Sequence, residues 1–239
     1  MGALLEVIAL SPADAQRAQA GGADRVELCG TLDSDGLSPE PGLVAKVRAA
    51  ASVQVRVMVR LRDGFGTDGG EATRLRGLID SYAAAGADGM VLGFLNGLDE
   101  IDLEVAGALT ADSDWPWTFH RAIDRCLDLD KAWTALRQLP RLDQVLTAGS
   151  ARGVEHGLDG LVRRAKADPW AAARIMAGGG LKPEHVPWLV RAGVRAFHVG
   201  SSVRPGGSYK AYVDPDLVRS WRTLIDTECR RARQGRADE

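Results

Sequence analysis

The chain has 239 residues, of which 45% are hydrophobic and 26% are charged, and its formal net charge is −2. This composition is ordinary for a globular protein, and the weak charge gives no electrostatic reason to expect nucleic acid or an anionic membrane as a partner. No apolar run approaches the roughly 20 residues of a membrane span, and the first residues lack the basic start of a secretory signal. Three scattered cysteines form no dense framework, which predicts a cytoplasmic protein.

A similar sequence motif recurs at three points where a helix is expected to end and a strand to begin. Residues 20–26, 85–90 and 192–197 each place an alanine and a glycine before a short apolar run. Glycine can adopt the left-handed conformation that closes a helix, so each segment is typical of a helix-to-strand connection in a parallel sheet. The recurrence indicates one repeated unit. Eight units in about 240 residues predict an α/β fold, a single closed (β/α)8 TIM barrel.

The expected elements can be given in chain order. Eight strands are expected at Leu4–Ala9, Arg25–Cys29, Val53–Val59, Gly89–Phe94, Trp117–His120, Gln144–Thr147, Arg174–Ala177 and Ala196–Val199. The first helix starts at Ser11-Pro12, and the others are expected near Pro41–Ala50, Gly70–Ala85, Asp99–Thr110, Asp128–Leu139, Val154–Ala167, Lys182–Ala192 and Asp216–Glu228. An open doubly wound sheet is the rival, but its central strands would be longer and wholly apolar. One domain is expected over 1–239, with the barrel at 4–228 and a basic tail at 229–239.

Two carboxylates stand within the first two strands. Barrel enzymes have their active sites at the C-terminal ends of the strands. Glu6 and Glu27 lie within the first two strands, and both are candidate site residues. Buried carboxylates are costly unless they are paired, and Arg56, Arg60 and Arg121 are available partners. Two interpretations stay open: a structural ion network, or an acid–base or cation-binding site.

Histidines end the fifth and eighth strands. His120 and His198 are two of only four histidines, and both are expected to face the barrel mouth without being neighbours. Arg121, the next residue after His120, can clamp an anion bidentately. Asp124 could orient either His120 or Arg121, and it could also cap a helix.

A glycine run and a serine pair follow the last two strands. In barrels these two loops often bind phosphate, because glycine lets a ligand approach the backbone and a following helix start offers free N–H groups. We therefore expect a phosphate, sulfate or carboxylate ligand there, although glycines also serve tight turns. The residues expected to bind it are Arg121, Thr147, Gly178, Gly179, Gly180, Ser201, Ser202 and Arg204.

Cys29 ends the second strand. A free cysteine is usually a small buried hydrophobic residue, but it could be a soft ligand for copper(I) if it faces the mouth. No lysine ends a strand, which argues against Schiff-base chemistry, and no Walker loop, GxSxG or HExxH is present.

Together these segments resemble the CutC family, known as copper homeostasis proteins. The resemblance runs from residue 5 to about 212 and is carried by residues 22–29, 36–43, 57–60, 118–124, 145–149, 177–181 and 197–198. It implies a cytoplasmic (β/α)8 barrel, usually a homo-oligomer, with a link to copper. The chain departs from the family pattern at Gly200, where a serine is expected.

Two classes of function follow. The first is a copper-binding protein with Cys29 as the thiol ligand. The second is an enzyme, either a lyase, an isomerase or a hydrolase, that acts on an anionic and perhaps phosphorylated small molecule at the barrel mouth. For the enzyme, the residues expected to carry the catalysis are Glu6, Glu27, Arg60, His120, Asp124 and His198.

Overall fold

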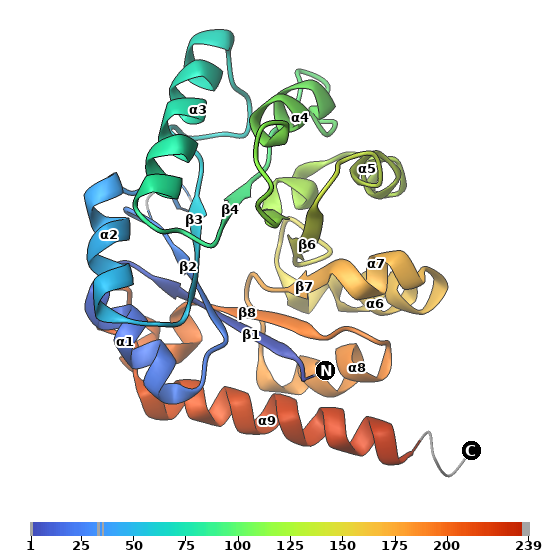
Figure 1. Cartoon of the computed structure of the whole chain (residues 1–239). Coiled ribbons are helices and arrows are strands. Elements are labelled where there is room, and N and C mark those ends of the chain that lie inside the picture. Colours follow the sequence, from blue (N-terminus) through green and yellow to red (C-terminus); the bar gives the residue numbers. More distant parts are fainter. Residues whose placement is uncertain (1, 33, 35, 236–239) are drawn as a thin grey trace.

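The computed structural model describes residues 2–32, 34 and 36–235 and forms a closed barrel of eight parallel strands. The strands follow one another around the barrel in chain order, and β8 pairs with β1 to close it (Figure 1). They are β1 (Leu4–Ala9), β2 (Arg25–Leu28), β3 (Gln54–Met58), β4 (Gly89–Leu92), β5 (Trp117–Phe119), β6 (Leu142–Thr147), β7 (Ile175–Ala177) and β8 (Ala196–Val199). The predicted (β/α)8 barrel is confirmed.

Helices surround the barrel (Figure 1). They are α1 (Pro12–Gly21), α2 (Pro41–Ala50), α3 (Gly69–Ala84), α4 (Leu103–Thr110), α5 (Leu129–Leu136), α6 (Val154–Ala167), α7 (Pro169–Arg174), α8 (Val186–Arg191) and α9 (Pro215–Gln234). The last helix, α9, packs against both α1 and α8, so it closes the ring of helices around the barrel. Among the described residues, no helix is both long and apolar enough to cross a membrane.

Side-chain caps fix where most helices begin. The Ser11 hydroxyl accepts a hydrogen bond from the Asp14 amide, and Asp102 does the same for Val105. The helix expected from residue 99 therefore starts later, at Leu103. Sequence patterns also missed α7, which begins at a proline directly after Asp168, the residue that caps it.

The C-terminal segment differs from the expected tail. Helix α9 continues to Gln234, and Cys229 within it is buried. Residues 229–234 therefore complete an amphipathic helix that packs on the barrel. Residues 236–239 of the expected tail lie outside the described residues.

The barrel wall separates an apolar layer from a polar interior. Alternate strand residues, such as Val7, Val57 and Phe197, face outward and are buried under the helices in one large apolar cluster. The residues between them face the barrel axis. The buried polar and charged residues of this inner set are Glu6, Arg25, Glu27, Arg56, Thr118, His120 and His198. A polar interior of this kind positions the candidate site.

Candidate active site

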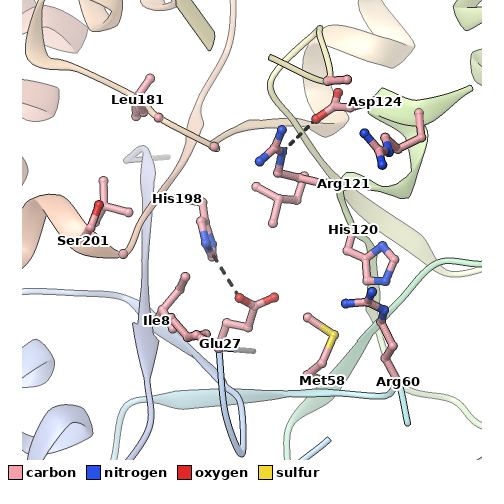
Figure 2. Close-up of a pocket in the computed structure, with 18 of the residues that line it drawn as sticks. Ile8, Glu27, Met58, Arg60, His120, Arg121, Asp124, Leu181, His198 and Ser201 are labelled. Carbon is pink, nitrogen blue, oxygen red and sulfur yellow. Dashed lines mark hydrogen bonds and ion pairs between the residues drawn. The ribbon is translucent and has the colours of Figure 1, made fainter. Parts of the chain in front are cut away.

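A cavity of about 570 Å³ opens at the C-terminal ends of the strands. Figure 2 shows side chains from opposite sides of the barrel converging on it. The predicted site residues that line it are Glu27, Arg60, His120, Arg121, Asp124, Gly179, Gly180, His198, Ser201 and Ser202. This is the place in the fold where barrel enzymes carry out their chemistry.

Glu6 lies below the cavity and is fully buried. Arg25 donates to it over 2.5 Å, and His198 Nδ1 lies 2.8 Å from its other oxygen. Burial alone would raise the pKa of Glu6, but the positive charges of Arg25 and His198 outweigh burial and lower it to about 2. Glu6 is thus a permanent carboxylate with both oxygens occupied. The partner is Arg25, not the expected Arg56, which instead makes a bidentate pair with Asp143.

Glu27 lines the cavity and makes no hydrogen bond to any described residue. Its Oε1 is buried without a partner, and its Oε2 lies 3.7 Å from His198 Nε2. Burial outweighs the positive charge of His198 and, with the negative charge of Glu6, raises the pKa of Glu27 to about 7. Glu27 is therefore a carboxyl that can gain and lose a proton near neutral pH.

His198 connects the two glutamates. Its Nδ1 donates to the Glu6 carboxylate, so its Nε2 is the atom turned toward Glu27 (Figure 2). Burial opposes a charged ring, but the carboxylates of Glu27 and Glu6 outweigh it and raise the pKa of His198. Glu6 thus fixes the ring, and His198 Nε2 can exchange a proton with Glu27.

His120 faces the same cavity from β5. Its Nδ1 accepts a hydrogen bond from the Ala122 amide at 3.2 Å. Burial, together with the positive charges of Arg60 and Arg121, lowers the pKa of His120 to about 3. The ring is therefore neutral, and because Nδ1 is the acceptor, its proton is on Nε2. That Nε2 is buried and has no partner among the described residues.

Arg60 holds the loops around the cavity. Its guanidinium donates to the backbone carbonyls of Ser34, Gly36 and Gly64. It also lies over the Phe65 ring at 4.8 Å, and that ring is 5.3 Å from His120. The expected catalytic role of Arg60 is thus joined by a structural one, since it orders two loops at the mouth.

Asp124 orients Arg121. The carboxylate accepts from Arg121 Nε at 2.9 Å, from the Thr147 hydroxyl at 2.6 Å and from the amides of Ala148 and Gly149. Of the roles expected for Asp124, the structure supports the one that concerns Arg121, since His120 takes its hydrogen bond from Ala122. Thr147 supports Asp124 from behind the cavity wall.

The glycine run approaches Arg121 closely. A Cβ added at Gly179 would lie 2.6 Å from the Arg121 guanidinium, and Gly179 has a φ of +85°. The amides of Gly179 and Gly180 make no hydrogen bond within the described part of the chain. The Arg121 guanidinium and the glycine run therefore lie together at one part of the cavity, which Ser201 and Ser202 also line.

The helix expected to begin at Lys182, directly after the glycine run, begins later than predicted. Residues Pro183–His185 form a 3-10 turn, and α8 begins only at Val186 and has six residues. Its first amides lie beyond the glycine run, and the expected contribution of a helix dipole does not apply here. Gly178 also lies behind the wall, packed against His198 and Leu146.

Arg204 does not reach the cavity. It is buried, forms an ion pair with Asp14 at 3.1 Å, and donates to the carbonyls of Ile8 and Ala211. The expectation that Arg204 contacts an anion is therefore not met by the geometry. Arg204 instead fastens the loop after β8 to the barrel.

Cys29 is buried beside the cavity and packs with Met58 and Val91. Burial raises the pKa of the Cys29 thiol well above its usual range, and the charges of Glu27 and Glu6 add to the effect. No group of three histidine, cysteine, aspartate or glutamate side chains that could hold a metal exists within residues 2–32, 34 and 36–235.

Several site residues escaped sequence reasoning. Arg25 and Phe65 were not considered, and neither was Tyr209, which lines the cavity. Gly93 makes room for His120, because a Cβ there would lie 2.6 Å from the ring Nδ1. A glycine directly after the fourth strand was the signal that could have found it.

Comparisons with known proteins agree with this fold. The CutC family model matches residues 3–203. CutC of Klebsiella pneumoniae (strain 342) is 33% identical over 230 residues, which is 92% of each chain. CutC of Caulobacter vibrioides (strain NA1000 / CB15N) is 38% identical over 200 residues, which is 82% of this chain and 80% of the relative. A solved candidate copper homeostasis protein CutC from Streptococcus agalactiae is 27% identical, with a TM-score of 0.73, over 83% of this chain and 98% of its own. The chain belongs to the CutC family.

Proposed function

We propose that this protein is an enzyme that moves a proton on a small phosphorylated molecule bound in the cavity at the barrel mouth. The observation that carries the proposal is Glu27. A carboxyl that is 3% exposed, makes no hydrogen bond to another described residue and faces a cavity is costly to maintain. A buried carboxyl maintained at such a cost is typical of a general acid or base. His198 Nε2 lies 3.7 Å from Glu27 Oε2, where the two groups can exchange a proton.

The opposite end of the cavity supports an anionic substrate. Asp124 accepts from Arg121 Nε, and the other two guanidinium nitrogens make no hydrogen bond to a described residue, so they could bind a ligand. Gly179 lies against it, and neither the Gly179 nor the Gly180 amide makes a hydrogen bond to another described residue. A phosphate group accepts hydrogen bonds from both kinds of donor, and an arginine can bind it bidentately. A phosphate bound there leaves the rest of the molecule inside the cavity with Glu27.

The residues around Cys29 do not fit copper(I). Copper(I) prefers thiolate and thioether ligands, and Met58 beside Cys29 could supply the thioether. The thiol, however, lies in an apolar cluster near two glutamates that disfavour its ionisation. The nearby groups that carry chemistry are carboxylates and imidazoles, which suit proton transfer better than a copper(I) cage.

A cytoplasmic location remains part of the proposal. Cys29, Cys126 and Cys229 are all free and buried, which suits a reducing compartment. Assembly into a homo-oligomer also stays a prediction.

The experiment is a thermal-shift screen with phosphorylated metabolites of three to six carbons and their dephosphorylated counterparts. We expect at least one phosphorylated compound to raise Tm and its counterpart to have no effect, because a ligand that binds only the folded state stabilises it. Affinity for each hit is then measured by titration calorimetry.

Two variants locate the anion. Arg121→Gln should weaken binding of a hit roughly 10- to 150-fold, since a hydrogen bond to a charged group contributes about 1.5–3 kcal/mol. Arg125→Gln is the matched control, because it removes the same charge from an exposed residue at the cavity rim. If no compound stabilises the protein, or if both variants behave alike, the proposed anion site is wrong.

A further inference from the structure

Resting on the proposed function, we infer that the substrate carries a carbonyl group beside the carbon that loses its proton, and that His120 Nε2–H binds the carbonyl oxygen while Glu27 removes the proton. The protein would then catalyse an enolisation, the step shared by isomerases and epimerases of ketose and aldose phosphates. Two side chains that line one cavity carry this inference, because each has a buried polar atom with no partner among the residues that the structure describes: His120 Nε2 and Glu27 Oε1.

The first step concerns His120. The Ala122 amide donates to Nδ1, so this nitrogen holds a lone pair and the ring proton is on Nε2. The ring is held in this orientation by Phe65 on one side and by Phe119, whose centroid is 6.1 Å away. An oriented neutral imidazole is a hydrogen-bond donor, so it suits an oxygen on which negative charge develops.

The second step concerns Glu27. It comes from β2 and His120 from β5, so the two residues face the cavity from different sides of the barrel (Figure 2). A ligand between them can meet an acceptor at one end and a donor at the other. Arg121 and the glycine run beside it, which line the same cavity, mark where a phosphate would anchor such a ligand.

The chemistry balances without a cofactor. Glu27 takes the proton from the carbon next to the carbonyl, and the electron pair of that C–H bond forms a C=C bond. The carbonyl π pair moves to the oxygen, which becomes an enolate oxygen that accepts the hydrogen bond from His120 Nε2–H. Glu27 then returns its proton to the same carbon, which restores the carbonyl, or to the former carbonyl carbon. In the second case His120 Nε2 passes its proton to the enolate oxygen and takes the proton of the hydroxyl on the adjacent carbon, which becomes the new carbonyl. A neutral histidine paired with a glutamate base is a known solution for this reaction in another barrel enzyme.

The test compares two probes by titration calorimetry. Phosphoglycolohydroxamate is a planar mimic of an enediolate phosphate, and glycerol 3-phosphate is its match without the planar oxygen. We expect the wild-type protein to bind the hydroxamate at least tenfold more tightly. His120→Phe, which keeps an aromatic ring but removes the donor, should abolish this preference while glycerol 3-phosphate binds as before.

The outcomes separate the two proposals. If both probes bind equally to the wild type, or if the preference persists in His120→Phe, the inference is overturned and the proposed function stands. If neither probe binds, both fall. If His120→Phe does not fold, a measurement on the wild-type protein provides the test. The ¹⁵N NMR spectrum of the His120 ring should show an unprotonated Nδ1 and a protonated Nε2, and the Nε2 signal should shift when the hydroxamate binds. A protonated Nδ1 would also overturn the inference.

Discussion

The barrel interior holds two glutamates on neighbouring strands, and their surroundings differ in almost every respect. Glu6 has an arginine and a histidine on its oxygens and a pKa lowered to about 2. Glu27 makes no hydrogen bond within the described part of the chain, faces the cavity, and has a pKa raised to about 7. The contrast shows how one buried carboxylate can support another. Glu6, bound by Arg25, holds His198 in place, and Glu27 remains free to react.

The largest expected effect is on stability. Glu6→Gln leaves Arg25 buried without a counter-ion, and we expect the free energy of unfolding to fall by about 3–5 kcal/mol. Glu27→Gln, the matched variant on the next strand, should cause a much smaller loss, because the ion pair of Glu27 with His198 is 3.7 Å long and has no hydrogen bond. Urea unfolding monitored by circular dichroism measures both. Equal losses in the two variants would contradict the comparison.

The two glutamates should also give stability opposite pH dependences. The unfolded value for both is near 4.5. Between about pH 2 and 4.5 the unfolded state holds the Glu6 proton more tightly, so the free energy of unfolding rises with pH. Between 4.5 and about 7 the folded state holds the Glu27 proton more tightly, so the free energy of unfolding falls with pH, by up to about 3 kcal/mol.

Glu27→Gln isolates this second effect. Unfolding curves of the variant from pH 4.5 to 8 should lack the fall attributed to Glu27, so the difference between variant and wild type grows as pH rises. A difference that stays constant over this range would mean that Glu27 titrates at its ordinary pKa.

Asp124 should have a smaller effect on stability and a clear one on binding. In Asp124→Asn, one oxygen that now accepts from the backbone or from Thr147 is replaced by an amide donor, and each unsatisfied buried group costs about 1–3 kcal/mol. Arg121 loses its orienting partner at the same time. Calorimetry should show weaker binding of any phosphorylated hit. Unchanged affinity would show that Arg121 does not depend on Asp124.

The smallest expected effect concerns copper. Competition with a copper(I) chelator should show only weak binding, and Cys29→Ser should not change it, because the thiol is protonated and surrounded by apolar groups. The substitution should also cost about 1–3 kcal/mol of stability, because it places a hydroxyl in an apolar cluster. Tight one-to-one binding that the substitution abolishes would favour the copper-binding class over the enzyme.

The sequence was enough to predict the barrel, because a glycine closes a helix before a buried strand in repeated units. It did not separate Glu6 from Glu27. Which residues face each other depends on the stagger of the strands, and the register places Glu6 beside Arg25 on β2 and His198 on β8. No local pattern encodes that stagger.

Loop residues were harder to predict for a related reason. Arg204 follows a strand end and could have pointed into the mouth, but the loop after β8 turns so that it meets Asp14 in α1. The departure at Gly200 has a similar cause: a Cβ there would lie 2.2 Å from the Tyr209 hydroxyl, which belongs to the same loop. Such long-range contacts decide which strand-end residues reach the cavity.

The central claim is that Glu27, and not Glu6, is the carboxyl that exchanges a proton in the cavity. Its most direct test is a ¹³C NMR titration of the glutamate carboxyl carbons from pH 3 to 9, with the Glu27→Gln variant to assign the signal. We predict a Glu27 signal with a midpoint near 7 and a Glu6 signal that does not titrate above pH 4. A Glu27 midpoint near 4.5, its ordinary value, would contradict the account.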